Sequence, residues 1–211
     1  MSELLLVDRD DLGAFAARAV RLESDGVVRL RQREARTGGP DLLDAWLATP
    51  FDVLATRTVE GIIEPGDVTV SGNELLAALA VARGDRLDPG PPRDLLWRAP
   101  LPPVTGWRLV EDLPVAVVSD LADRGIEVAR DNPGPHGTPP AALLDQEVLT
   151  VEGEGLQVKI PLRCLFALSG MGFLAADAGP VRVSATESWL RIDARFGAVV
   201  RRRHALLPLL F

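Results

Sequence analysis

Few residues of this sequence combine the types and positions that catalysis needs. A nucleophilic serine or cysteine requires a base within reach, and histidine is the side chain best suited to that role near neutral pH. The sequence contains two histidines. His136 lies in a loop rich in proline and glycine, and His204 follows three arginines whose charge disfavours its protonation. We therefore expect both histidines to be ordinary surface residues.

Cys164 is the only cysteine, and it follows Arg163 near the start of a predicted helix. The helix dipole and the arginine can stabilise a thiolate there if the side chain is exposed. The apolar neighbours favour burial as a small core residue instead. Cys164 and Arg163, together with Asp120 and Asp123, are our candidates for a ligand cleft between the two halves of the chain.

The acidic clusters have structural explanations. Asp8, Asp10 and Asp11 open a predicted helix, where N-capping and the helix dipole explain them better than a metal site does. Glu152 and Glu154 flank the glycines of a predicted hairpin turn. The sequence contains neither a glycine-rich phosphate loop nor paired cysteine or histidine ligands. We therefore predict no catalytic residues, no metal and no cofactor, and we favour a protein that is not an enzyme.

Basic residues gather near the end of the sequence. Six arginines and only two acidic residues follow position 180, although the whole chain has a net charge of −7. The candidate basic surface consists of Arg191, Arg195, Arg201, Arg202 and Arg203. Such a surface either binds nucleic acid or is a solvated edge that prevents strand-to-strand aggregation. Because the body of the chain is acidic, we favour the second role and do not expect nucleic acid as the partner.

Composition places the chain among ordinary globular proteins. It has 211 residues, of which 47% are hydrophobic and 25% charged, and 22 of its 23 basic residues are arginines. The arginine bias is typical of a GC-rich bacterial genome. The single cysteine allows no internal disulfide, and the first residues do not resemble a secretory signal. The longest apolar stretch, 165–176, is too short to span a membrane. We therefore expect a cytoplasmic protein without membrane contact.

The spacing of apolar residues predicts an α+β fold. In residues 1–83 we expect an amphipathic helix over 8–23, a strand after Gly26, a short helix over 42–47, a strand hairpin made by 51–59 and 67–70, and a helix over 74–82. Residues 84–106 contain six prolines and read as a linker.

Residues 107–211 repeat this mixture of helices and strands. We predict helices over 113–129 and 162–173, a hairpin made by 146–151 and 156–160, and a C-terminal antiparallel meander made by 181–185, 189–194 and 198–203. The two α+β halves and the linker between them are the predicted domains.

The order of short motifs suggests an internal duplication. The sequence around Leu6-Val7-Asp8 recurs at Leu109-Val110-Glu111, and Val59-Glu60-Gly61 recurs at Val151-Glu152-Gly153. Further pairs are 26–31 with 125–130, 42–44 with 143–145, 68–70 with 158–160, 75–76 with 165–166, and 97–98 with 189–191. The separation between paired motifs changes from about 103 to about 90 residues along the chain. Chance similarity in a chain rich in leucine and valine also explains such pairs.

Three functions follow from these features. The first is a binding or scaffolding protein that contacts a protein partner or a second copy of itself, because pairs such as Trp107/Arg108 and Trp189/Arg191 suit interfaces. The second is nucleic-acid binding through the basic strands. The third is an enzyme or small-ligand protein with a site between the halves. We favour the first, although most of the four tryptophans are expected to be buried.

Overall fold

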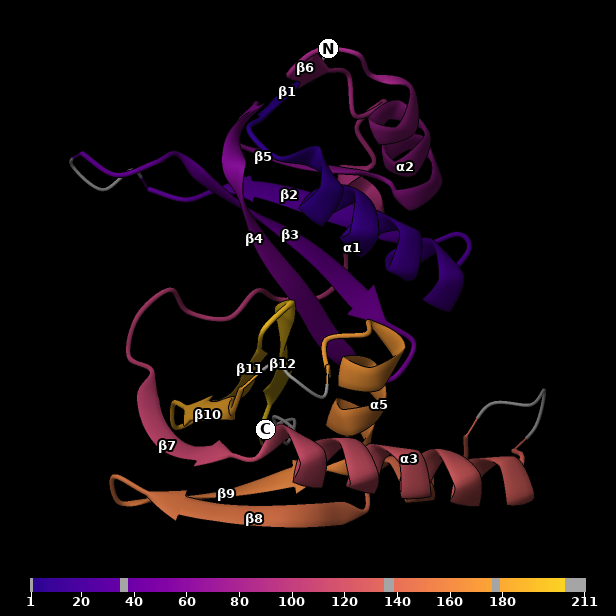
Figure 1. Ribbon diagram of the computed structural model, residues 1–211, viewed down its shortest axis with the longest axis vertical. Helices are drawn as coiled ribbons and strands as arrows, with labels where there is room; N and C mark the ends of the chain where they lie inside the picture. The colour runs from indigo at the N-terminus through magenta and orange to yellow at the C-terminus, as the bar shows by residue number, and fades with distance from the viewer. Residues whose placement is uncertain (1, 35–37, 135–138, 176–178, 204–211) are drawn as a thin grey trace, which may run out of the picture. The chain divides into compact units, whose positions relative to one another are not determined.

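The computed structural model describes residues 2–34, 38–134, 139–175 and 179–203. The chain divides into two compact units, Met1–Pro100 and Leu101–Phe211, which we describe separately. Each unit combines helices with antiparallel sheet (Figure 1), so the α+β prediction is confirmed. No helix within the described ranges is long and apolar enough to span a lipid bilayer.

The first unit begins with a strand followed by a helix. Its elements are β1 (Glu3–Leu6), α1 (Arg9–Leu22), β2 (Val27–Gln32), β3 (Leu42–Thr49), β4 (Val53–Glu64), β5 (Asp67–Ser71), α2 (Gly72–Val81), β6 (Arg86–Leu87) and the 3-10 helix η1 (Asp94–Leu96). Four strands form an antiparallel sheet in the order β5-β2-β3-β4. Strand β1 pairs with both β4 and β6.

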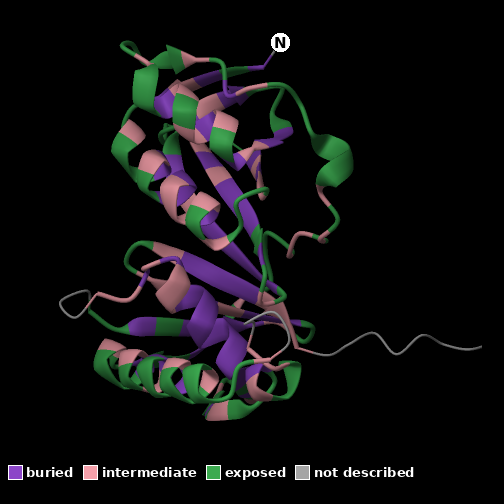
Figure 2. Cartoon of the chain, turned by 90° about the vertical axis from the view of Figure 1, so that its right-hand side faces the viewer, coloured by how far each residue is buried: buried purple, intermediate pink, exposed green. Residues whose placement is uncertain are grey.

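Helix α1 forms as its sequence predicts. Asp8 caps it by accepting a hydrogen bond of 2.9 Å from the backbone N–H of Asp10, which confirms the capping role of this acidic cluster. Leu12, Phe15 and Ala16 are buried along one face. This face packs against α2, β3 and β4 (Figure 2), so the core of the first unit lies between the two helices and the sheet.

Strand β3 replaces the helix predicted over 42–47. Leu43, Ala45 and Leu47 have no exposed surface, and their spacing of two residues is that of a strand with one buried face. Pairing with β2 on one side and β4 on the other satisfies the backbone. The predicted hairpin is also wrong, because β4 does not pair with β5, which pairs with β2 instead.

The proline-rich segment after α2 covers one edge of the sheet. The backbone N–H of Arg93 donates to the carbonyl oxygen of Thr69 at 2.6 Å, and the Thr69 N–H donates to Asp94 Oδ1 at 2.7 Å. These bonds occupy the outer edge of β5, which would otherwise be open to another strand. Residues 84–100 therefore belong to the first unit.

The second unit again begins with a strand followed by a helix. Its elements are β7 (Arg108–Leu113), α3 (Val115–Asp131), α4 (Ala141–Leu144), β8 (Glu147–Gly153), β9 (Leu156–Pro161), α5 (Leu162–Gly170), β10 (Val181–Ala185), β11 (Trp189–Ala194) and β12 (Gly197–Arg202). The last three strands form the predicted antiparallel meander, with β7 beside β10. Strands β8 and β9 form the predicted hairpin.

Helix α5 is the centre of the second core. Every residue from Leu162 to Leu168 is buried. Helix α3 packs against it at Gly125, where a Cβ atom would lie 2.5 Å from Leu162 Cδ1. The absence of a side chain at Gly125 therefore lets the two helices approach each other closely. The other face of α3 is exposed.

The predicted duplication is visible in the positions of two glycines. A Cβ atom at Gly61 in β4 would lie 2.4 Å from the carbonyl oxygen of Leu5 in β1. A Cβ atom at Gly153 in β8 would lie 2.1 Å from the carbonyl oxygen of Val110 in β7. Each glycine thus ends a Val-Glu-Gly motif and lies against the strand that precedes the first helix of its unit.

The strand and helix that follow each Val-Glu-Gly motif also correspond. Val68 and Val70 are buried in β5, as Val158 and Ile160 are in β9. Both strands lead directly into a helix, α2 and α5 respectively. Three other motif pairs do not match in structure. Residues 26–31 include strand β2, whereas 125–130 are part of α3. Residues 42–44 lie in β3, whereas 143–145 lie at the end of helix α4, and 97–98 form a loop, whereas 189–191 form a strand. The duplication therefore holds for part of each unit.

Candidate functional site

The residues proposed for a ligand cleft do not converge. Cys164 is 1% exposed inside α5, so its thiol is buried as a core residue. Arg163 is also buried and forms an ion pair with Asp145. Asp120 and Asp123 lie on the exposed face of α3, where Asp120 forms an ion pair of 2.8 Å with Arg124. His136 and His204 lie outside the described residues.

The arginines of the C-terminal strands have partners within the second unit. Arg191 forms an ion pair of 2.7 Å with Asp193, and Arg201 lies 3.7 Å from the carboxylate of Asp145. The guanidinium of Arg195 lies 5.7 Å from the ring centroid of Phe196. These contacts stabilise the meander. Arg202 and Arg203, in contrast, contact Trp189 and Thr186 at the turn between β10 and β11.

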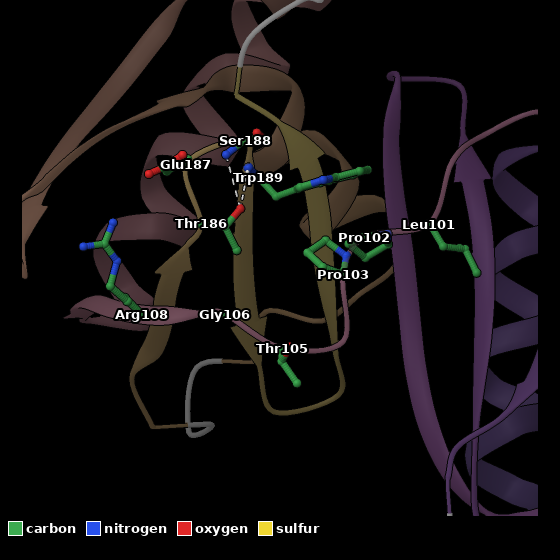
Figure 3. Close-up of a pocket in the computed structure, with 10 residues that line it drawn as sticks. All are labelled: Leu101, Pro102, Pro103, Thr105, Gly106, Arg108, Thr186, Glu187, Ser188 and Trp189. Atoms are coloured by element: carbon green, nitrogen blue, oxygen red, sulfur yellow. Dashed lines mark hydrogen bonds between the residues drawn. The ribbon is translucent and has the colours of Figure 1, made fainter.

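An open groove lies beside the turn between β10 and β11 (Figure 3). Its volume is about 820 Å³. One wall is the segment before and at the start of β7, and the other is the turn. The lining residues are Leu101, Pro102, Pro103, Thr105, Gly106, Arg108, Thr186, Glu187, Ser188 and Trp189.

Hydrogen bonds fix the turn that forms one wall of the groove. The hydroxyl oxygen of Thr186 accepts from the backbone N–H groups of Ser188 at 3.2 Å and Trp189 at 3.0 Å (Figure 3). The guanidinium of Arg203 donates to the Thr186 carbonyl oxygen at 2.9 Å, and its backbone N–H donates to Ser188. The turn is therefore held in one conformation by its own residues and by the residue that follows β12.

The opposite wall is fixed by proline and by two side chains. Pro102 and Pro103 restrict the backbone, and the indole N–H of Trp107 donates to the carbonyl oxygen of Pro103 at 2.9 Å. Arg108 donates to the carbonyl oxygen of Glu154 at 3.2 Å, which ties the start of β7 to the turn of the β8–β9 hairpin. Both walls are thus held by hydrogen bonds within the second unit.

Apolar, hydroxyl and charged side chains line the groove. Pro102, Pro103 and Trp189 supply apolar surface, and the hydroxyl groups of Thr105 and Ser188 supply hydrogen bonds. No lining residue is a cysteine or a histidine, and the described part of the chain has no cluster of three or more metal-ligating side chains. Of the pairs Trp107/Arg108 and Trp189/Arg191 expected at an interface, Arg108 and Trp189 line this groove. No motif in the sequence pointed to the turn residues.

The four tryptophans differ in burial. Trp46 and Trp189 are 6% and 7% exposed, whereas Trp97 and Trp107 are partly exposed. Arg29 lies 5.8 Å from the ring centroid of Trp97, and this pair joins β2 to the segment after η1. Trp189 contributes to the groove from a mostly buried position.

Two arginines are held by carboxylates on exposed sheet surfaces. Arg182 donates to Asp112 at 3.0 Å, and this hydrogen bond lowers the pKa of the Asp112 carboxyl below its ordinary value and raises the pKa of Arg182. A hydrogen bond to Asp67 likewise raises the pKa of Arg29. These pairs link neighbouring strands and lie outside the groove lining.

Two family comparisons divide the chain where the structure does. Residues 2–99 match a domain of unknown function, DUF8010, and residues 102–206 match a domain of unknown function, DUF8185. These ranges coincide with the two compact units. No curated protein matches the sequence.

The fold resembles the DNA polymerase III beta sliding clamp. The beta sliding clamp of C. crescentus is 13% identical, with a TM-score of 0.60 over 99% of this chain and 67% of the clamp. The DNA polymerase sliding clamp of Pseudomonas aeruginosa is 13% identical, with a TM-score of 0.56 over 98% of this chain and 66% of the clamp. The Bartonella birtlesii DnaN clamp, bound to griselimycin, is 13% identical, with a TM-score of 0.56 over 99% of this chain and 67% of the clamp. The chain thus spans about two thirds of the length of these clamps.

Proposed function

We propose that this chain is a non-catalytic scaffold protein of the bacterial cytoplasm that binds an extended segment of a partner protein in the groove beside the β10–β11 turn. The observation that carries the proposal is the lining of the groove. Prolines and a tryptophan line it together with hydroxyl groups, which is a surface typical of peptide recognition. Both walls are held by hydrogen bonds, so little ordering would accompany binding.

The resemblance to sliding clamps supports a scaffold more than an enzyme. In the C. crescentus structure, polyethylene glycol is bound at a region proposed to tether a beta-motif. The clamps of this fold thus offer binding surfaces, and we transfer to this chain only that general property. Histidine and cysteine are absent from the residues that line the groove.

Binding of nucleic acid is the second candidate, and the charges of the described residues oppose it. The exposed face of α3 carries Asp120, Asp123 and Glu127 against Arg124. In the meander, Arg191 and Arg201 already lie near carboxylates. A continuous basic surface, which phosphate binding requires, is therefore not formed by these residues.

A peptide selection with a groove variant tests the proposal. A random-peptide library is selected on the immobilised full chain, and the enriched peptides are measured by fluorescence anisotropy on the wild type and on Thr105→Trp. The exposed Thr105 lines the groove, so a bulky uncharged side chain there is expected to weaken binding by about tenfold or more, or roughly 1.4 kcal/mol.

The matched control is Thr150→Trp, because Thr150 is also exposed but lies on β8 outside the groove lining. This variant is expected to bind the peptides as the wild type does. Failure to enrich any peptide, or equal binding by the Thr105→Trp variant, would rule out the groove as the site.

A further inference from the structure

One arginine lines the groove, and two more contact residues of its wall. Arg108 is exposed and lines it directly. The guanidinium of Arg202 lies 5.0 Å from the ring centroid of Trp189, and Arg203 reaches the carbonyl oxygen of Thr186 at 2.9 Å. The groove lining includes one acidic side chain, Glu187. The surroundings of the groove are therefore positive, in a chain whose net charge is −7.

Within the described ranges, none of these three arginines forms an ion pair with a carboxylate. Among the described residues, Arg108 and Arg203 donate to backbone carbonyl oxygens, and Arg202 lies over an aromatic ring. A carbonyl oxygen satisfies a guanidinium N–H but carries no formal charge. Arg182 and Arg191, on the neighbouring strands, instead form ion pairs with aspartates. The arginines at the groove thus remain available to carboxylates of a partner.

We infer that the partner segment is acidic, with an apolar side chain between two or more aspartates or glutamates. This inference rests on the function proposed above. The apolar side chain would contact Pro102 and Pro103. The flanking carboxylates would accept hydrogen bonds from Arg108 at one wall and from Arg202 or Arg203 at the other. The planar guanidinium group suits such pairing, because it presents two parallel N–H donors to one carboxylate.

The same positive charges would attract nucleic acid, but the groove does not suit it. Single strands bind where bases stack on accessible aromatic rings. Trp189 is 7% exposed, and Arg202 already lies over its ring. Glu187 would also repel the phosphates of a strand lying along the turn. Carboxylate side chains on an apolar peptide match the groove better.

Peptides that differ only in charge test the inference. Short fluorescein-labelled peptides with a common Leu-Phe-Leu core carry flanks of glutamate, glutamine or lysine. At low salt the glutamate-flanked peptide is expected to bind wild type about tenfold more tightly than the glutamine-flanked peptide, and the lysine-flanked peptide more weakly still. Added salt should reduce the difference, because these charges are partly exposed.

Variants assign the preference to the groove. Arg108→Gln should remove most of the advantage of the glutamate flanks, and Arg108→Glu should shift the preference toward lysine flanks. Arg182→Gln is the control, since Arg182 is exposed but paired with Asp112 away from the groove. The control should keep the wild-type preference, and Thr105→Trp should weaken every peptide by filling the groove.

The outcomes separate this inference from the proposed function. If the glutamate and glutamine peptides bind equally and Thr105→Trp weakens both, the groove binds peptides and the acidic preference is wrong. If no peptide binds, the proposed function fails with it. If a single-stranded or double-stranded oligonucleotide displaces the glutamate-flanked peptide and binds more tightly, the arginines serve nucleic acid and the inference is overturned.

Discussion

Replacing Leu165 by alanine is expected to destabilise the second unit by about 3 kcal/mol, a large share of the roughly 5–15 kcal/mol that stabilises a typical domain. Leu165 has no exposed surface and lies in α5, whose first seven residues are all buried. Removing its side chain leaves a cavity that the surrounding core cannot fill completely. Urea unfolding, followed by hydrogen exchange of individual peptides, measures the loss.

The position of the change can be resolved within the chain. Peptides from 108–170 should exchange faster in the Leu165→Ala variant, whereas peptides from 3–81 should exchange as in wild type, because they belong to the other unit. Leu95→Ala is the control, since Leu95 is 87% exposed. Equal loss of protection in both units would contradict the division into two units, and an unchanged midpoint would contradict the placement of α5 in the core.

Alanine at either duplicated glycine is expected to cost about 2–3 kcal/mol, because the added Cβ atom would collide with a backbone carbonyl oxygen. The distances are 2.4 Å for Gly61 and 2.1 Å for Gly153, so a strand must move in each case. At Gly13, inside α1, a Cβ atom meets nothing within 4 Å. Gly13→Ala should therefore be neutral or stabilising, by up to about 1 kcal/mol, through helix propensity.

The two glycines should differ in their effect on binding. Gly153→Ala should displace β7 at Val110, two residues after Arg108. It should therefore lower the stability of the second unit and also weaken peptide binding at the groove. Gly61→Ala should reduce stability alone. Thermal unfolding and anisotropy titrations of the three variants check both statements. Destabilisation by Gly13→Ala as large as that of Gly61→Ala would show that the close approaches are not the cause.

Local patterns predicted the elements whose evidence is local. Asp8 stands at the start of an amphipathic segment, and it caps α1 as expected. The alternation in the last three strands gave the meander, and Cys164 among apolar neighbours is buried. The helix predicted over 42–47 is wrong because leucine and alanine favour helices, whereas the strand is set by distant partners. Leu43 and Leu47 are buried on one face of β3, which pairs with β2 and β4.

The groove could not be predicted from local patterns because its walls are distant in the sequence. Pro102 and Pro103 meet the turn at Thr186 only through the pairing of β7 with β10. The prolines of the segment 84–106 suggested a linker, yet its first part caps the edge of β5 and its last part forms a wall of the groove. The repeated Val-Glu-Gly motif carried more information, because both of its glycines lie against the strand before the first helix of a unit.

Hydrogen exchange of the complex is the most direct test of a peptide-binding groove in the second unit. The wild-type chain is measured with and without a saturating amount of the glutamate-flanked peptide. We predict that the bound peptide slows exchange in residues 101–108, 186–189 and 202–203 only. The last range is included because it consists of Arg202 and Arg203. Protection centred on α3 or on the first unit, with these segments unchanged, would contradict the site proposed for this protein.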